Sequence, residues 1–96
     1  MDKKVFFHLS RRLRILGKDF DPYESIRCGR KTVEYRSNSR FWRLHLIQAK
    51  PTKAWFVVGY PKDNLPRLEA DITRIVRRHS TNQIEVHFEH VVEITK

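Results

Sequence analysis

One stretch in the first half of the chain holds the side chains best suited to chemistry. Residues 29–36 read G-R-K-T-V-E-Y-R and bring together the amine of Lys31, the carboxylate of Glu34 and the guanidinium of Arg36. A lysine partly removed from water can act as a general base or hold an oxyanion. A neighbouring carboxylate opposes this role, because it favours the charged ammonium in a plain ion pair. Lys31 and Glu34 are therefore the candidate catalytic pair, and an ion pair without chemistry is the alternative.

The local sequence predicts how these groups are presented. Gly29 can adopt the left-handed conformation that ends a helix without a Cβ clash. The residues after it alternate as in a strand, with 32, 34 and 36 on a polar face and 33 and 35 on an apolar face. This pattern is typical of a half-buried strand whose solvated face carries an ion pair of Glu34 and Arg36. Lys31 lies at the junction of turn and strand and can reach either side.

A short helix is predicted just before the turn. The sequence D-P-Y-E at 21–24 supplies a capping carboxylate, a proline for the first helical position and a glutamate that can reach back to the cap amide. The helix runs to about Cys28 and has fewer than two turns. Such a helix is not stable alone, so we expect it to dock through Tyr23 and Ile26.

Strands are predicted over most of the remaining chain. Alternation or apolar runs indicate strands at about 4–9, 41–47, 54–60 and 84–94, and the run at 54–60 is typical of a central strand. Trp42, Leu44 and Leu46 share the predicted buried face of their strand. His90 falls on the apolar face of the last strand, either in the core or lining a pocket. Residues 67–78 fit a helix by periodicity or a strand by β-branched content, and 10–18 fit a short helix or an irregular basic loop.

The charge of the chain is strongly positive and unevenly distributed. Lys and Arg number 20 against 11 Asp and Glu, which gives a formal net charge of +9 over 96 residues. Residues 1–53 hold 14 of the cations and 5 of the anions, whereas residues 54–96 hold 6 of each. Such asymmetry favours a polyanionic partner, with RNA or DNA ahead of an anionic membrane surface. The length supports one hydrophobic core, so we expect a single domain over residues 1–96.

Other chemistries find little support in the sequence. The single cysteine, Cys28, excludes an internal disulfide and fits a reducing compartment, and no apolar run is long enough for a membrane span. No signal peptide is recognisable, so we expect a cytoplasmic location. The five histidines lack metal-ligand spacing, Cys28 has no identifiable base, and the three glycines cannot form a phosphate-binding loop. We expect no metal and no cofactor.

The segment G-R-K-T-V-E-Y-R resembles the signature of the ASCH domain, a family of PUA-like β-barrels linked to RNA. The resemblance implies an α+β, mainly β fold: a small PUA-like β-barrel of five to six strands with one short helix. It also favours a strand at residues 67–78, because a barrel needs this segment to pair with the last one. Many relatives carry a Gly-Asp turn after the strand that holds the arginine, whereas this chain reads S-N-S-R-F-W there.

The resemblance and the charge lead to the main hypothesis, a domain that binds RNA or a modified nucleoside in a pocket formed around the motif. Lys31, Glu34 and Arg36 would edge this pocket, and exposed cations would contact phosphates with salt-sensitive affinity. Phe41 is a better candidate than the core-facing Trp42 for stacking on bases. The candidate nucleic-acid-binding residues are Arg27, Arg30, Lys31, Arg36, Arg40, Phe41 and Arg43.

Two further functions stay open at the same residues. Some ASCH relatives are implied to hydrolyse the acetyl amide of N4-acetylcytidine with the motif lysine, a hydroxyl residue three positions on and a distant glutamate. Lys31 matches the lysine, position 34 is a glutamate, and the possible distant carboxylates are Glu69, Glu85 and Glu89. Other relatives are implied to act as ribonucleases, again through the motif lysine. The third hypothesis is a basic module that binds protein.

Overall fold

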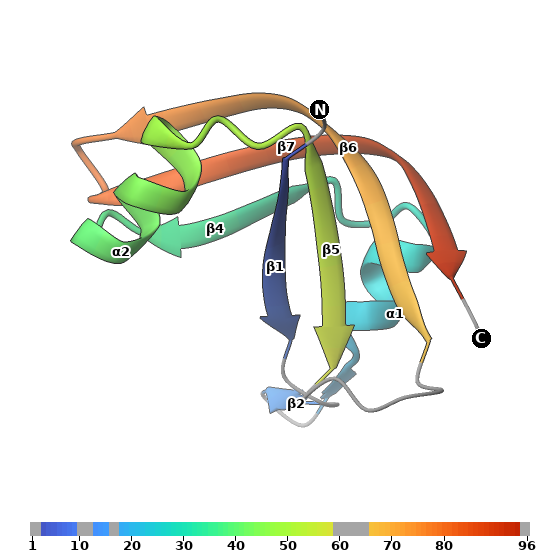
Figure 1. Cartoon of the computed structure of the whole chain (residues 1–96). Helices are drawn as coiled ribbons and strands as arrows, with labels where there is room; N and C mark the ends of the chain where they lie inside the picture. Colours follow the sequence, from blue (N-terminus) through green and yellow to red (C-terminus); the bar gives the residue numbers. More distant parts are fainter. Residues whose placement is uncertain (1–2, 10–12, 16–17, 59–65, 95–96) are drawn as a thin grey trace.

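The chain folds around one curled sheet. The computed structural model describes residues 3–9, 13–15, 18–58 and 66–94. The strands of the sheet are β1 (Lys4–Leu9), β4 (Val33–Ser37), β5 (Lys53–Val58), β6 (Arg67–Arg78) and β7 (Gln83–Ile94). They lie in the order β1-β5-β6-β7-β4, with β1 and β5 parallel and the other neighbours antiparallel. The sheet curls into a half-barrel with β1 and β4 at its edges (Figure 1).

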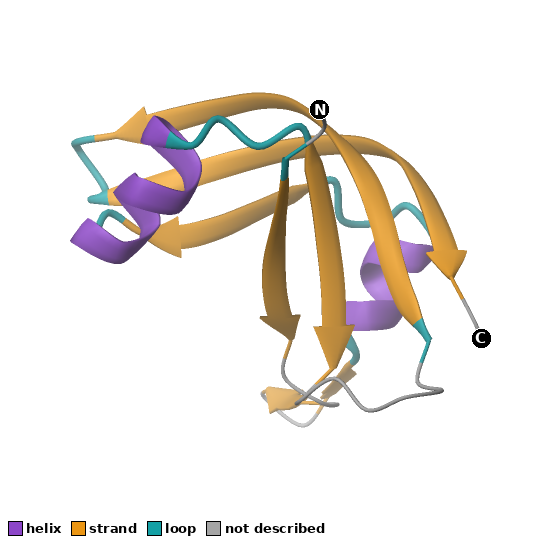
Figure 2. Ribbon diagram, viewed as in Figure 1, coloured by secondary structure: helices purple, strands orange, loops and turns teal. Residues whose placement is uncertain are grey.

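The mainly β fold predicted from the sequence is confirmed (Figure 2). β1 and β7 lie where the alternating patterns predicted them, and residues 67–78 form a strand that pairs with β7. β5 is central as expected, since it lies between β1 and β6. The predicted end of that strand, Gly59 and Tyr60, lies outside the described residues. In place of a closed barrel, the described strands leave the sheet open between its two edges.

The prediction of a strand at 41–47 is wrong, because this segment is helical. A single turn, α2 (Arg40–Trp42), continues into a π-helix, η1 (Arg43–Gln48). Ser39 caps the start, since its hydroxyl accepts a hydrogen bond from the Trp42 amide at 3.4 Å. Trp42 and Leu46 are four residues apart, a spacing that suits one side of a helix as well as one side of a strand. The fold therefore has a second helical segment besides the predicted one.

The region 10–18 also differs from the prediction of a helix or irregular loop. Two short strands, β2 (Leu13–Ile15) and β3 (Lys18–Phe20), pair antiparallel there. Residues 10–12 and 16–17 lie outside the described part of the chain. The predicted helix follows directly as α1 (Pro22–Arg27), with a C-cap at Cys28.

The long β6–β7 hairpin contains two irregularities of register, and one of them overturns the prediction for His90. His90 has a φ of 55°, and its exposed side chain lies 3.1 Å from the Asp71 carboxylate. A bulge of this kind moves the following side chains to the opposite face of the sheet. Val91 accordingly packs on the core and Val92 is exposed. His90 therefore belongs neither to the core nor to a pocket.

The buried side chains define an inner face of the sheet, and the opposite side is the outer face. Ile26 of α1 and Leu46 of η1 are both buried, so both helical segments cover the inner face. This docking of α1 through Ile26 confirms the prediction. Neither helical segment of the described chain is long and apolar enough to cross a membrane. The largest fully buried side chains are Phe7, Ile26, Leu46, Phe56, Leu68, Ile84 and Val86.

Candidate functional site

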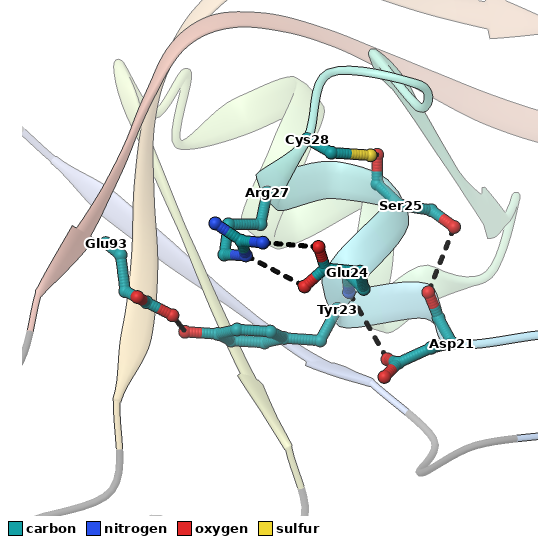
Figure 3. A network of polar contacts seen from close by, with 7 residues as sticks. All are labelled: Asp21, Tyr23, Glu24, Ser25, Arg27, Cys28 and Glu93. Carbon is teal, nitrogen blue, oxygen red and sulfur yellow. Dashed lines mark hydrogen bonds and ion pairs between the residues drawn. The ribbon is translucent and has the colours of Figure 1, made fainter.

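The helix before the motif is capped at its start and tied to β7 by its first turn. The Asp21 carboxylate accepts a hydrogen bond from the Glu24 amide at 3.2 Å, as the capping pattern predicted. The Glu24 carboxylate pairs with Arg27 instead of returning to the cap amide, which corrects that part of the prediction. The Tyr23 hydroxyl donates to Glu93 of β7 at 2.8 Å (Figure 3). Burial, and then the hydrogen bond to Glu93, raise the pKa of Tyr23.

The turn after α1 is set by Gly29. Its φ of +85° is the left-handed conformation that the sequence predicted, and its amide donates to the Ile26 carbonyl at 3.2 Å. The chain then folds back, because the Lys31 amide donates to the Ser25 carbonyl at 2.9 Å. This closed turn fixes the backbone of Lys31 beside the start of β4.

Lys31, Glu34 and Arg36 meet at one oxygen atom. Glu34 Oε1 lies 3.2 Å from Lys31 Nζ and 2.9 Å from Arg36 Nη1. The same oxygen accepts a hydrogen bond from the Tyr35 amide at 3.0 Å. The three side chains that the sequence singled out therefore form one contiguous cluster, which we call the Glu34 cluster.

This cluster lies on the inner face, which reverses the predicted orientation of β4. Glu34 is 4% exposed and Tyr35 is 47% exposed, so the polar residues point inward and the tyrosine points to solvent. In the ladder Glu34 is opposite Val86 and Arg36 is opposite Ile84, and both partners are fully buried. Burial of a carboxylate is feasible here because two cations and an amide surround one of its oxygens.

Two aromatic rings hold the Arg36 guanidinium in place. Its Cζ atom lies 4.9 Å from the Phe7 ring centroid and 5.4 Å from that of Trp42. The two rings stack on each other, with centroids 5.6 Å apart. Neither Phe7 nor Trp42 was predicted as part of a site, although Trp42 was predicted to face the core. Cation–π contact with a partly desolvated arginine restricts its orientation. Its Nη1 atom lies 2.9 Å from Glu34 Oε1 and donates a hydrogen bond to the Tyr35 carbonyl at 2.8 Å.

The second oxygen of Glu34 has no partner. Among the described residues, Oε2 is buried and accepts no hydrogen bond. A buried polar atom left unpaired destabilises a fold by roughly 1–3 kcal/mol, so such an atom is a place where a further hydrogen-bond partner is favourable. An ionised carboxylate oxygen can only accept, and a ligand with an N–H or O–H group is the complementary partner. The cluster thus offers an acceptor from Glu34 and donors from its two cations.

The other predicted nucleic-acid-binding residues lie outside the cluster, in two groups. Arg27 and Arg30 are exposed on α1 and its turn, and Arg27 is paired with Glu24. Arg40, Phe41 and Arg43 belong to the helical segment instead of a strand. Phe41 is 56% exposed, and its ring stacks on His45 with centroids 4.1 Å apart.

Arg77 is a cation that the sequence reasoning missed. It is exposed near the β6–β7 turn, and its Nε donates to Asn38 Oδ1 at 3.1 Å. The count of charges by halves of the chain did not single out Arg77, because the acidic residues of the second half balance the basic residues of that half. A shorter window would have found it, since residues 73–82 contain three arginines and no acidic residue.

The three distant carboxylates considered for catalysis have partners away from Lys31. Glu69 accepts from Trp55 Nε1 at 2.8 Å, and Glu89 is exposed beside His90. Glu85 lies on the outer face, paired with Arg78 and His87. The hydrogen bond from Arg78 holds the pKa of the Glu85 carboxyl below its usual range, with a smaller contribution from His87.

A separate cleft of about 310 Å³ lies between η1 and β6. Its walls are largely apolar, with Lys50 and Arg74 among the lining residues and Leu46 and Ile72 among the apolar ones. Within the described ranges, no three His, Cys, Asp or Glu side chains are grouped to hold a metal ion. No protein-family model matches the chain, and neither the curated proteins nor the solved structures contain a significant match to it.

Proposed function

We propose that the chain is an ASCH-type, PUA-like domain that binds RNA or a modified nucleoside at the Glu34 cluster. The observation that carries the proposal is the buried Oε2 of Glu34, which has no partner among the described residues, while Oε1 of the same carboxylate contacts Lys31 and Arg36. Such an atom is expected to gain a hydrogen bond when a ligand arrives, and that gain is a source of affinity and selectivity.

The chemistry of the cluster suits the edge of a nucleobase. A carboxylate oxygen pairs well with an exocyclic amine, as in the recognition of the cytosine 4-amino group by Asp or Glu. The Lys31 ammonium and the Arg36 guanidinium supply donors for the ring and carbonyl acceptors next to such an amine. The net positive charge of the chain supports the approach of a phosphorylated ligand.

Nucleoside titration tests the proposal with a matched pair of variants. Cytidine, N4-acetylcytidine and uridine are titrated by calorimetry or by chemical-shift mapping into the wild type, Glu34→Gln and Glu85→Gln. Glu34→Gln replaces the bare acceptor and weakens binding by roughly tenfold or more, because a buried hydrogen bond to a charged group is lost. Glu85→Gln removes a similar carboxylate from the outer face and leaves affinity unchanged. Equal affinities in all three proteins, or no binding at low salt, would overturn the proposal.

A hydrolase at the same cluster is the second candidate, in which the Lys31 ammonium, paired with Glu34 at 3.2 Å and with its side chain 28% exposed, would hold an oxyanion. Incubation with N4-acetylcytidine or with mixed RNA tests it, with release of cytidine or shortening of the RNA as the readout. An enzyme loses this activity in Lys31→Ala while the variant keeps its fold by circular dichroism. If neither RNA nor nucleosides bind or react, a protein-binding basic module becomes the better interpretation.

A further inference from the structure

We infer that the ligand is a single nucleic-acid strand whose backbone runs from the Glu34 cluster across the inner face toward the β6–β7 turn. Four arginines mark this path, and we call them the arginine track: Arg36, Arg40, Arg43 and Arg77. The inference rests on the proposed function for the base and adds the route of the phosphates. It replaces a free nucleoside by a strand several nucleotides long.

Arg36 and Arg77 project from the same side of the sheet. Ile84 of β7 is the direct ladder partner of Arg36 on β4 and of Arg77 on β6. Directly paired residues share a face, and Ile84 is fully buried, so both arginines belong to the inner face. The two strand spacings between them amount to roughly 10 Å. A stacked strand advances about 3.4 Å per nucleotide, so this distance corresponds to about three nucleotides.

Asn38 joins the sheet part of the track to its helical part. Its side chain accepts from Arg77 Nε at 3.1 Å, and its backbone carbonyl accepts from Arg43 Nη1 at 2.9 Å. Each guanidinium therefore commits one nitrogen to Asn38, and among the described residues the donors on its other two nitrogens have no hydrogen-bond partner and can meet phosphate oxygens. Arg40 is exposed at the start of α2, one turn before Arg43.

Arg36 is the one member of the track that pairs with a carboxylate in the described part of the chain, at 2.9 Å from Glu34. Among the ion pairs between described residues, none includes Arg40, Arg43 or Arg77. On the outer face, Arg78 pairs with Glu85 at 3.0 Å. Uncompensated positive charge therefore gathers on the inner side of the β6–β7 tip and on the helix beside it, at one end of the half-barrel (Figure 1).

The aromatic residues on the helix favour a nucleic acid over an acidic protein. Phe41 is largely exposed next to Arg40, and stacking of a base on such a ring contributes roughly 1–3 kcal/mol of binding. Trp42 connects this surface to the Glu34 cluster, because the guanidinium of Arg36 packs on its ring. A base must leave a duplex to reach the buried oxygen of Glu34, so the expected partner is single-stranded.

Two adjacent arginines on opposite faces provide the test. A labelled single-stranded RNA of about 12 nucleotides, within the usual range of such sites, is titrated by fluorescence anisotropy at several KCl concentrations. Arg77→Ala weakens binding roughly fivefold to tenfold and lowers the slope of log affinity against log salt by about 0.7. Arg78→Ala removes the same charge from the outer face and changes affinity by less than about twofold. Circular dichroism confirms that both variants are folded.

Each outcome decides a separate part of the inference. Equal losses in Arg77→Ala and Arg78→Ala would overturn the path, because net charge alone would then govern binding. Polyglutamate that competes as well as RNA would overturn a nucleic-acid partner, and a duplex that binds as tightly as the single strand would overturn single-strandedness. RNA binding that depends on Arg77 without any nucleoside binding would keep the path and reject the base site. Nucleoside binding together with an RNA affinity that does not depend on Arg77 would keep the base site and reject the path.

Discussion

Two carboxylates on neighbouring strands, each with two basic partners, lie on opposite faces of the same sheet. Glu34 of β4 points inward, where a lysine and an arginine contact it. Glu85 of β7 points outward, where Arg78 and His87 contact it. In composition the two groups are nearly equivalent, so the residue types alone do not distinguish a site from a surface ion pair.

The two groups differ in how their oxygens are used. Glu85 pairs Oε2 with Arg78 at 3.0 Å and Oε1 with His87 at 3.2 Å, and its side chain is 18% exposed. Oε1 of Glu34 accepts hydrogen bonds from Lys31 and the Tyr35 amide and lies 2.9 Å from Arg36, whereas Oε2 is buried without a partner among the described residues. A pair that only stabilises the fold is expected to satisfy both oxygens or to leave them to water. The unused oxygen of Glu34 is therefore the difference on which the proposed ligand site rests.

The largest expected effect is the difference in folding stability between the variants that lack Glu34 and those that lack Glu85. Glu34→Ala leaves two cations and an amide without their acceptor, a loss of roughly 3 kcal/mol for a buried pair, offset by roughly 1 kcal/mol as the bare oxygen disappears. The net destabilisation of about 2 kcal/mol lowers the melting temperature by about 10 °C in a domain of this size. Glu85→Ala has a much smaller effect, because its partners remain exposed to water.

Thermal denaturation of the two alanine variants at pH 7 measures this difference. Equal changes in melting temperature would contradict the distinction between a buried cluster and a surface pair. Arg36→Lys serves as an inner-face control. It keeps the charge and loses the planar stacking on Phe7 and Trp42, so its melting temperature is expected between those of the wild type and Glu34→Ala.

The next largest effect is expected when the left-handed residue of a turn is replaced, in the turn before β4 or in the β6–β7 turn. Gly29→Ala destabilises the fold by about 1 kcal/mol, because alanine strains a φ of +85° even though no atom lies within 4 Å of the added Cβ. The melting temperature falls by about 4–8 °C, and nucleoside affinity falls because the Lys31 backbone is displaced. Asn82 has a φ of 55° in the β6–β7 turn and serves as the control. Asn82→Ala is expected to destabilise the fold while leaving nucleoside affinity unchanged, and a parallel loss of affinity would contradict this role of Gly29.

The elements that could be predicted from the sequence are those with strong local signals. The cap at Asp21 and the glycine at position 29 define α1 through contacts within a few residues. The long alternation of β7 defines its first half for the same reason. The alternation pattern predicts the wrong face for His90, because the bulge there depends on pairing with β6. No residue type near His90 predicts a bulge.

The orientation of β4 could not be predicted, because it depends on residues distant in the chain. Alternation shows that Glu34 and Arg36 share a face but does not show which face is covered. Phe7 and Trp42 decide it, since their rings receive the Arg36 guanidinium, and Trp42 does so from a helix that was predicted as a strand. The grouping of Lys31, Glu34 and Arg36 was predictable because the three lie within six residues of each other.

The smallest expected effect is the response of the outer pair to acid. The hydrogen bond from Arg78 lowers the pKa of Glu85 from its usual value of 4.5, so ionised Glu85 stabilises the folded state above that pH. This contribution is lost as the pH falls below 4.5 and through the lower pKa of the folded state. Glu85→Gln lacks it, so we expect the variant to have a slightly lower melting temperature at pH 6 and a flatter decline between pH 5 and pH 3.

Melting curves of the wild type and Glu85→Gln across this range check the sign, and the two should converge at the acidic end. Asp71 provides a second case on the outer face, because Lys53 and then His90 lower its pKa from 3.8, and Asp71→Asn should flatten the decline in a more acidic interval. Salt at 1 M should shrink both differences, since exposed pairs are screened. A steeper acid decline in Glu85→Gln than in the wild type would contradict the assignment of Glu85 as a saturated, stabilising pair.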